Sequence, residues 1–302
     1  MKIWRFFNSI GNCSATLLVA LAALSCSYLQ EETEFTPSFT GIREFFSLDS
    51  GDIIVSGHRG GFMDGYPENC LESFKQISSR MPVYFEIDPR FTKDSVVVLM
   101  HDEDISRSTD GSGTLSGKTY EELRLLRLKD RKGTLTRSHI PTFDSVLEWS
   151  KDKVILNLDR KDVPVKVLAD KLKEHGADNC IFTVHYPSQA LEVLECKPDA
   201  LFSAFIWSDE ILQEYEAHGL LEHIVVAYVL AAYPQEDMYS LYSKINSHGI
   251  RCMVSVVNEQ DLFTSSKRKE YYGYLVEAHP DVIETDRPLE FIGLKGIRAY
   301  QR

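Results

Sequence analysis

The chain has 302 residues and a formal net charge of −12. This charge excludes recognition of nucleic acid through an overall basic footprint, and it argues against simple electrostatic docking on anionic lipid. Hydrophobic residues make up 43% of the chain, which is enough apolar surface for a large buried core. The length would hold two average domains, but one α/β barrel routinely uses a similar length.

Residues 1–25 have the pattern of an export signal. Lys2 and Arg5 give a positive start, and residues 16–24 form an apolar run that is too short to span a bilayer comfortably. The Ala-Leu-Ser-Cys sequence that ends at Cys26 resembles a bacterial lipoprotein signal, although the usual leucine is replaced by alanine here. We therefore expect a signal peptide, a lipid anchor on Cys26 and a periplasmic, outer-membrane or cell-surface location in a bacterium. An ordinary secretory signal that is cut nearby is the alternative.

Residues 26–50 look like a tether, because they are acidic, contain Ser and Thr and show no clear period. Beyond them, four cysteines have no paired spacing of the kind that metal sites use. We expect these cysteines to be buried free thiols, since a barrel of this size does not need disulfides. They are Cys70, Cys180, Cys196 and Cys252.

From residue 51 to residue 302, short β-rich runs alternate with amphipathic helical stretches. The expected strands are residues 53–56, 83–88, 154–159, 180–184, 200–206, 223–228, 251–257 and 281–285. Helical periodicity is clear in residues 68–77, 163–175 and 238–249. Eight such strand–helix units predict an α/β fold of the (β/α)8 TIM-barrel type. An open doubly wound sheet is the alternative, but no G-x-G-x-x-G turn follows the first strand.

One segment, residues 102–140, breaks this rhythm after the second strand. It follows a strand-like run at residues 96–100 and contains Gly/Ser/Thr-rich loops and a helical stretch at residues 120–126. We expect an elaborated loop region over the catalytic face, because a second complete domain would need more chain.

Polar residues follow several of the expected strands at the point where each strand ends. In a parallel barrel, catalytic groups come from these C-terminal ends. The candidates are His58, Glu86, Asp88, His101, Asp159 and Lys161. Taken singly, an E-x-D pair also fits a salt-bridge network, and a histidine beside an arginine also fits an ordinary surface position. Several such groups at successive strand ends favour an active site.

These residue types suit hydrolysis at a phosphate. Glu86, Asp88 and Asp159 could supply the carboxylate oxygens that Mg²⁺ or Ca²⁺ prefers. Two histidines can act as general base and general acid on opposite sides of a phosphodiester. Arg59 and Lys161 can neutralise phosphate oxygens, although Arg59 and Asp102 also fit roles as structural ion-pair partners.

Trp207 follows the expected strand at residues 200–206. It is a candidate for one wall of a pocket that binds a choline-like cation. Packing beneath a loop is the alternative.

Six stretches occur in order: S-G-H-R-G-G at residues 56–61, Y-P-E-N-C at 66–70, F-E-I-D-P-R at 85–90, L-M-H-D at 99–102, R-S-T-D-G at 107–111 and I-E-T-D-R-P at 283–288. Over residues 52–290 they resemble the glycerophosphodiester phosphodiesterase family. The resemblance implies a (β/α)8 barrel that cleaves glycerophosphodiesters to glycerol 3-phosphate and an alcohol, usually with a divalent metal.

The resemblance also implies roles for individual residues. His58 and His101 match the acid/base pair, and Glu86 and Asp88 match metal ligands. Glu68 and Asn69 match a P-E-N motif, where we expect them, with Asp102, to orient the groups that touch substrate and metal. Asp159 and Lys161 match an E-x-K motif, and His185 lies where the family usually has a Ser-Phe-Asp-like stretch.

Two of these matches depart from the family. Asp159 is one methylene shorter than the usual Glu, which puts the affinity for the metal or its identity in doubt. His185 alters the expected substrate contacts, and we count it among the substrate-binding residues.

The functional hypothesis is an exported, lipid-anchored, metal-dependent phosphodiesterase that acts on small glycerophosphodiesters. Its alternatives are a surface protein that binds head groups without catalysis and a related phospholipase that acts on intact lipids. The sequence leaves the alcohol, the metal and the oligomeric state open.

Overall fold

The computed structural model describes residues 41–229, 238–257 and 264–300. The predicted signal peptide, Cys26 and residues 26–40 of the predicted tether lie outside these ranges. Within the described residues, no helix is long and apolar enough to cross a membrane.

Eight parallel strands close into a barrel in the order β1-β12-β11-β10-β9-β8-β7-β2. They are β1 (Ile54–Gly57), β2 (Val83–Ile87), β7 (Leu156–Leu158), β8 (Cys180–Val184), β9 (Phe202–Phe205), β10 (Ile224–Tyr228), β11 (Arg251–Ser255) and β12 (Val282–Thr285). Each of them falls on a strand that the sequence predicts. The α/β TIM-barrel fold is therefore confirmed.

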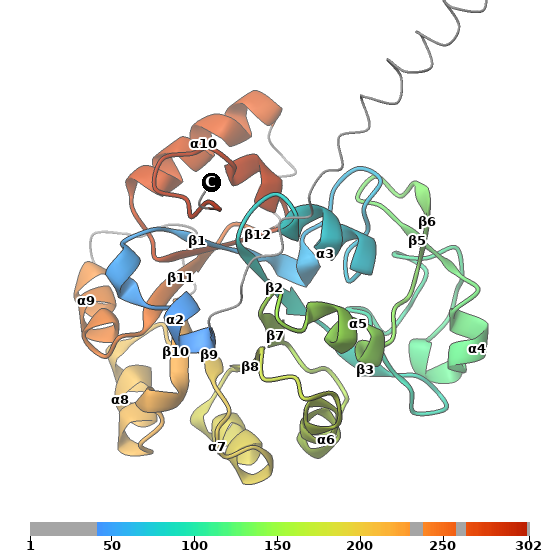
Figure 1. Cartoon of the computed structure of the whole chain (residues 1–302), viewed down its shortest axis with the longest axis horizontal. Coiled ribbons are helices and arrows are strands. Elements are labelled where there is room, and N and C mark those ends of the chain that lie inside the picture. The colour runs from blue at the N-terminus through green and yellow to red at the C-terminus, as the bar shows by residue number, and fades with distance from the viewer. Residues whose placement is uncertain (1–40, 230–237, 258–263, 301–302) are drawn as a thin grey trace, which may run out of the picture. The chain divides into compact units, whose positions relative to one another are not determined.

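Helices follow the strands and surround the barrel, and Figure 1 shows α6 to α10 arranged around its strands. They are α3 (Leu71–Ser78), α5 (Phe143–Ser150), α6 (Val165–His175), α7 (Pro187–Cys196), α8 (Asp209–Ala217), α9 (Tyr239–Ser247) and α10 (Ser265–Glu277). The eighth unit differs, because β12 is followed by a short 3-10 helix, η7 (Pro288–Phe291), and residues 286–300 contain no α-helix.

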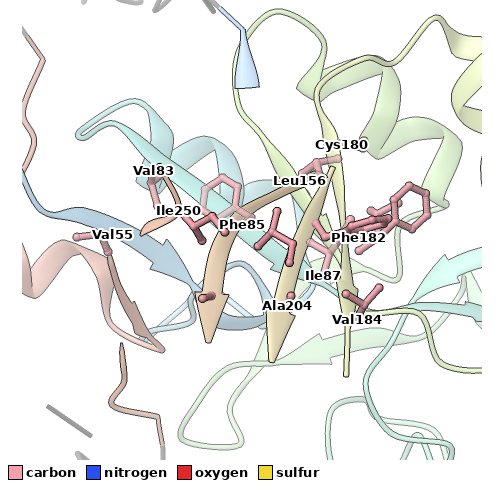
Figure 2. Close-up of a cluster of buried hydrophobic side chains, with 14 of the residues drawn as sticks. Val55, Val83, Phe85, Ile87, Leu156, Cys180, Phe182, Val184, Ala204 and Ile250 are labelled. Carbon is pink, nitrogen blue, oxygen red and sulfur yellow. The ribbon is translucent and has the colours of Figure 1, made fainter. Parts of the chain in front are cut away.

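Successive residues of each strand face opposite sides of the barrel wall, as strand geometry requires. In β2, Val83, Phe85 and Ile87 belong to the apolar layer between strands and helices, which Figure 2 shows with its neighbours. Tyr84 belongs to a separate apolar cluster inside the barrel, and Glu86 lines a cavity above that cluster. The interior is thus apolar near the N-terminal ends of the strands and polar near their C-terminal ends.

The elaborated region after the second strand contains two antiparallel hairpins. The first pairs β3 (Pro89–Phe91) with β4 (Val97–Leu99), and the second pairs β5 (Arg127–Lys129) with β6 (Leu135–His139). Between them lie η3 (Leu115–Gly117) and α4 (Tyr120–Leu123). The predicted helix at residues 120–126 is too long, because α4 ends at Leu123. The second hairpin was not predicted, because β6 is largely exposed and neither of its strands carries a clear apolar alternation.

The region also has a small apolar cluster of its own, which includes Ile105, Leu115, Leu123, Leu128 and Ile140. This cluster explains how the segment holds a defined shape without a separate domain.

The N-terminal end of the barrel is closed by residues that the sequence assigns to the tether. Two short helices, α2 (Ile42–Phe45) and η1 (Leu48–Ser50), precede β1. Phe46 is 2% exposed and packs edge-on against Tyr84, with 5.1 Å between the ring centroids. The predicted tether at residues 26–50 is therefore too long, and residues 41–50 belong to the barrel. The sequence does not reveal this, because residues 41–50 contact segments that are distant along the chain and come close only in the folded barrel.

The four cysteines are free thiols, as predicted. Cys70, Cys180 and Cys252 are buried, but Cys196 is exposed at the end of α7, where the prediction of burial is wrong.

A buried arginine ties the N-terminal segment to the barrel. Arg251, at the start of β11, is 1% exposed. It donates hydrogen bonds to the backbone carbonyls of Phe46 at 3.0 Å, Asp52 at 2.8 Å and Ser47. The buried guanidinium thus satisfies three backbone carbonyl groups of the N-terminal segment.

We expect Arg251→Met to lower the free energy of unfolding by about 3 kcal/mol, because it strands several buried carbonyl groups. Urea denaturation followed by circular dichroism measures this change. The matched control is Arg124→Met, which removes an exposed arginine paired with Glu121 on α4 and should change stability by no more than about 0.5 kcal/mol. Equal midpoints for the two variants would contradict the proposed role of Arg251.

Candidate active site

A cavity of about 270 Å³ opens at the C-terminal ends of the barrel strands. Predicted site residues and newly found ones share its lining. The lining residues are His58, Glu86, His101, Asn157, Asp159, Thr183, His185, Ser203, Phe205, Tyr228, Met253, Ser255, Val257 and Glu284.

His58 reaches the cavity from a tight turn directly after β1, the 3-10 helix η2 (His58–Gly60). Gly60 has a φ of 82°, and a Cβ there would lie 1.8 Å from the ring of Phe74. Gly61 has a φ of 71°, and its Cβ would lie 2.7 Å from Pro288. Only glycine fits both positions, so the H-R-G-G sequence is a requirement of this turn.

A buried carboxylate holds the His58 ring. His58 Nδ1 lies 2.7 Å from Asp286 Oδ1, which leaves Nε2 as the free ring nitrogen on a residue that lines the cavity. Burial disfavours the charged ring, but the hydrogen bond to Asp286 and the charges of Glu86 and Glu284 outweigh it and raise the pKa of His58 to about 9.

Three carboxylates lie together beside this histidine. Ligand atoms of Glu86, Asp88 and Asp159 all lie within 4.8 Å of one another. Burial and the neighbouring charge of Asp88 raise the pKa of Glu86 well above its usual value. Three hard oxygen donors of like charge, gathered in a buried place, match the preferences of Mg²⁺ and Ca²⁺. The residues present therefore fit a divalent metal.

Backbone and amide groups position these carboxylates. The amide N–H of Arg59 donates to Glu86 at 2.6 Å. The side chain of Asn69 donates to Asp88 at 2.6 Å and accepts from the backbone N–H of Asp88 at 3.1 Å. Asn69 thus fixes both the side chain and the backbone of Asp88.

Lys161 is not among the residues that line the cavity, but it pairs with two of the carboxylates. Its Nζ is 2.9 Å from Asp88, and it also contacts Asp159. Burial would lower the pKa of Lys161, but these two charges raise it instead. On the other side of Asp159, His185 Nε2 lies 3.9 Å away. Burial opposes ionisation of Asp159, but His185 and Lys161 lower its pKa.

His101 comes from the first hairpin, directly after β4, and not from a barrel strand. Its Nδ1 lies 2.7 Å from Asp102 Oδ1, and the other oxygen of Asp102 accepts from Arg107. Burial would raise the pKa of Asp102, but these two hydrogen bonds lower it to about 2.

Glu68, which the sequence predicts to orient neighbouring groups, pairs with two arginines. Its carboxylate accepts two hydrogen bonds from Arg107, at 2.6 and 3.0 Å, and lies 3.4 Å from Arg59. Arg59 itself is not among the residues that line the cavity, and its guanidinium pairs with Glu68.

The aromatic rings that line the cavity belong to His185, Phe205 and Tyr228, and not to Trp207, which the sequence predicts. The rings of His185 and Phe205 are 4.2 Å apart, and Tyr228 meets Phe205 edge-on at 4.5 Å. Trp207 is 38% exposed and does not line the cavity.

Sequence reasoning missed several residues of the site, above all Glu284 and Asp286 on and after β12. They form an E-x-D pair like Glu86 and Asp88, and this repeat was the available signal. Burial raises the pKa of Glu284, which accepts a hydrogen bond from Ser255 at 3.1 Å. Asn157 and Ser203 gave no signal beyond their strand position.

Comparisons with known proteins identify relatives of this chain. A sequence model of the Glycerophosphoryl diester phosphodiesterase family matches residues 58–290. The crystal structure of a glycerophosphoryl diester phosphodiesterase from Parabacteroides distasonis is 37% identical, has a TM-score of 0.79 and covers 84% of this chain and 91% of its own.

Of two further relatives, one has a lower sequence identity and the other matches over a shorter stretch. A phosphodiesterase from Oleispira antarctica, solved in complex with the product sn-glycerol-3-phosphate, shares the fold at 19% identity and a TM-score of 0.59, covering 80% of this chain and 96% of its own. Glycerophosphodiester phosphodiesterase 1 of Rattus norvegicus is 46% identical over 74 residues, which is 24% of this chain. This chain spans 22% of the length of that curated relative.

The family model covers both histidines and all three clustered carboxylates, and its range runs from the residue after the first barrel strand to beyond the last strand. The chain belongs to the glycerophosphoryl diester phosphodiesterase family.

Proposed function

We propose that this protein hydrolyses glycerophosphodiesters to glycerol 3-phosphate and an alcohol with the help of a divalent metal. One observation carries the proposal. His58 and His101 line the same cavity as Glu86 and Asp159, and each histidine has its Nδ1 held by a carboxylate. Family membership and the product bound to the Oleispira antarctica relative support the choice of substrate.

The two histidines can carry the proton transfers of the reaction. One ring accepts a proton from the attacking oxygen, and the other donates a proton to the alcohol oxygen as its bond to phosphorus breaks. The attacking oxygen belongs to water or to a hydroxyl of the substrate. In the second case a cyclic phosphate forms, and water opens it with the help of the same pair.

Glu86, Asp88 and Asp159 would hold the metal. When bound, it would supply positive charge to the phosphoryl oxygens. Lys161 contacts two of these carboxylates, and we propose that its ammonium offsets negative charge on a neighbouring phosphate. We propose the same task for Arg59, which pairs with Glu68.

We expect EDTA to abolish release of glycerol 3-phosphate and added Ca²⁺ or Mg²⁺ to restore it. Asn69→Ala should lower metal affinity about 10- to 100-fold, because Asp88 loses the amide that orients it. Isothermal titration calorimetry with the metal and activation curves measure this effect. Gln213→Ala, on the exposed surface of α8, is the matched control. Full activity in metal-free protein would contradict the metal site.

His58→Ala and His101→Ala should each lower kcat about 10²- to 10⁴-fold, since each removes one proton-transfer group. The assay is release of glycerol 3-phosphate from a panel of glycerophosphodiesters at saturating metal. His218→Ala, an exposed residue that ends α8 away from the cavity, should retain activity. Wild-type protein that binds these diesters without turnover would favour the head-group-binding alternative instead.

We also propose export and lipid attachment at Cys26, on the support of the signal-like sequence before it. In a bacterial host, Cys26→Ala should move the protein from the membrane fraction to the soluble fraction, as immunoblotting measures. Cys196→Ala, which removes an exposed thiol of the barrel, should stay with the membrane. Membrane association of Cys26→Ala would overturn the anchor.

A further inference from the structure

The inserted segment, residues 102–140, reaches both histidine–carboxylate pairs of the site. It supplies Asp102 and Arg107 near one histidine and Arg131 near the other.

Arg107 holds the carboxylate that holds His101. One oxygen of Asp102 lies 2.7 Å from His101 Nδ1, and the other accepts from Arg107 Nε. The far side of the guanidinium is fixed in turn, because its two terminal nitrogens donate to Glu68 at 3.0 and 2.6 Å. The guanidinium is therefore clamped between two carboxylates in a defined plane.

Arg131 makes the corresponding contact at the other pair. One oxygen of Asp286 lies 2.7 Å from His58 Nδ1, and the other accepts from Arg131 at 3.3 Å. The guanidinium of Arg131 lies over the ring of Phe62, 4.6 Å from its centroid. Its side chain is only 8% exposed.

The turn that carries Arg131 is pinned to the loop after His58. Asp130 accepts from the backbone N–H of Gly65 at 2.8 Å, and Lys132 pairs with Asp64 at 2.6 Å. These contacts on both sides of residue 131 bring the arginine to Asp286, which is 155 residues away along the chain.

The two halves of the site thus have the same construction. In each, an aspartate uses one oxygen for the histidine Nδ1 and the other for an arginine of the inserted segment. We propose that Arg107 and Arg131 are positioning residues that fix the orientation of His101 and His58 through Asp102 and Asp286. This inference rests on the proposed hydrolytic function, in which both rings transfer protons.

The charges of the two pairs agree with this role. Burial disfavours ionisation of both aspartates, yet their contacts with histidine and arginine lower both pKa values. An ionised carboxylate accepts from Nδ1–H and so keeps Nε2 available toward the cavity. Without its arginine, each carboxylate would lose a partner at one oxygen and could turn away from the ring.

The first test is a set of double-mutant cycles on kcat/KM for glycerol 3-phosphate release. We expect Arg107→Gln and Arg131→Gln each to lower kcat/KM about 10- to 100-fold through displacement of one ring. The matched background is Asp102→Asn for Arg107 and Asp286→Asn for Arg131. In its matched background, each arginine variant should lower kcat/KM by less than about threefold further. In the crossed background, where the aspartate of the other pair is replaced, each arginine variant should lower kcat/KM by the full factor, about 10- to 100-fold.

A purely structural role gives a different result. If the arginines only stabilise the fold, their effects multiply equally in matched and crossed backgrounds, and the proposal is wrong. Arg124→Gln, in the same segment but paired with Glu121 on an exposed face, is the control and should retain activity. Arg131→Lys, which keeps the charge, replaces Arg131→Gln in the cycle if the latter does not fold, with the same matched and crossed outcomes.

A second test needs no turnover. In protein with ¹⁵N-labelled histidine, Arg107→Gln should change the ring-nitrogen signals of His101 and leave those of His58 unchanged, and Arg131→Gln should do the reverse. Unchanged signals in both variants would overturn the positioning role. If the two variants show these paired changes but the wild-type protein cleaves no diester, the proposed function is refuted and the positioning role is retained.

Discussion

An excess of buried negative charge at one end of the barrel is the constraint on which the rest of the site depends. Glu86, Asp88, Glu284 and Asp286 are all less than 9% exposed, and Asp159 lies beside them. Carboxylates taken out of water are costly unless cations or hydrogen-bond donors compensate them. The protein's own cations compensate part of this charge, and the carboxylate cluster fits a metal that would compensate more of it.

The protein's own cations occupy distinct places around this charge. Lys161 bridges Asp88 and Asp159, and His58 with Arg131 shares Asp286. Each cation comes from a different loop, so the charge balance also holds those loops in place. The same ion pairs therefore contribute both to the electrostatics of the site and to the stability of the loops around it.

Much of this arrangement could be predicted from the sequence, because it follows from local spacing. Strand alternation alone places Glu86 and Asp88 on one face, and the end of the next barrel strand places Asp159 near them. The same reasoning should have found Asp286, which follows Glu284 by two residues. Trp207 has the same strand parity as Phe205, but it lies two residues beyond the strand end and is exposed.

Other parts could not be predicted, because they depend on contacts between distant segments. Residues 41–50 show no periodicity, and their partner Arg251 lies about 200 residues further along the chain. Arg131 lies in a polar turn of a hairpin whose strands are largely exposed, so no apolar pattern marks it. Its proposed positioning role depends on a contact with Asp286, which only the folded structure brings close.

The pairing of His58 with Asp286 joins residues 228 positions apart in sequence. One partner follows the first barrel strand and the other follows the last, and these two strands are neighbours only when the barrel closes. A nascent chain that lacks its last strand would hold His58 and the metal-site carboxylates, but it would lack the group that orients His58. The His58–Asp286 pair would thus form only after the last barrel strand has been synthesised and the barrel has closed.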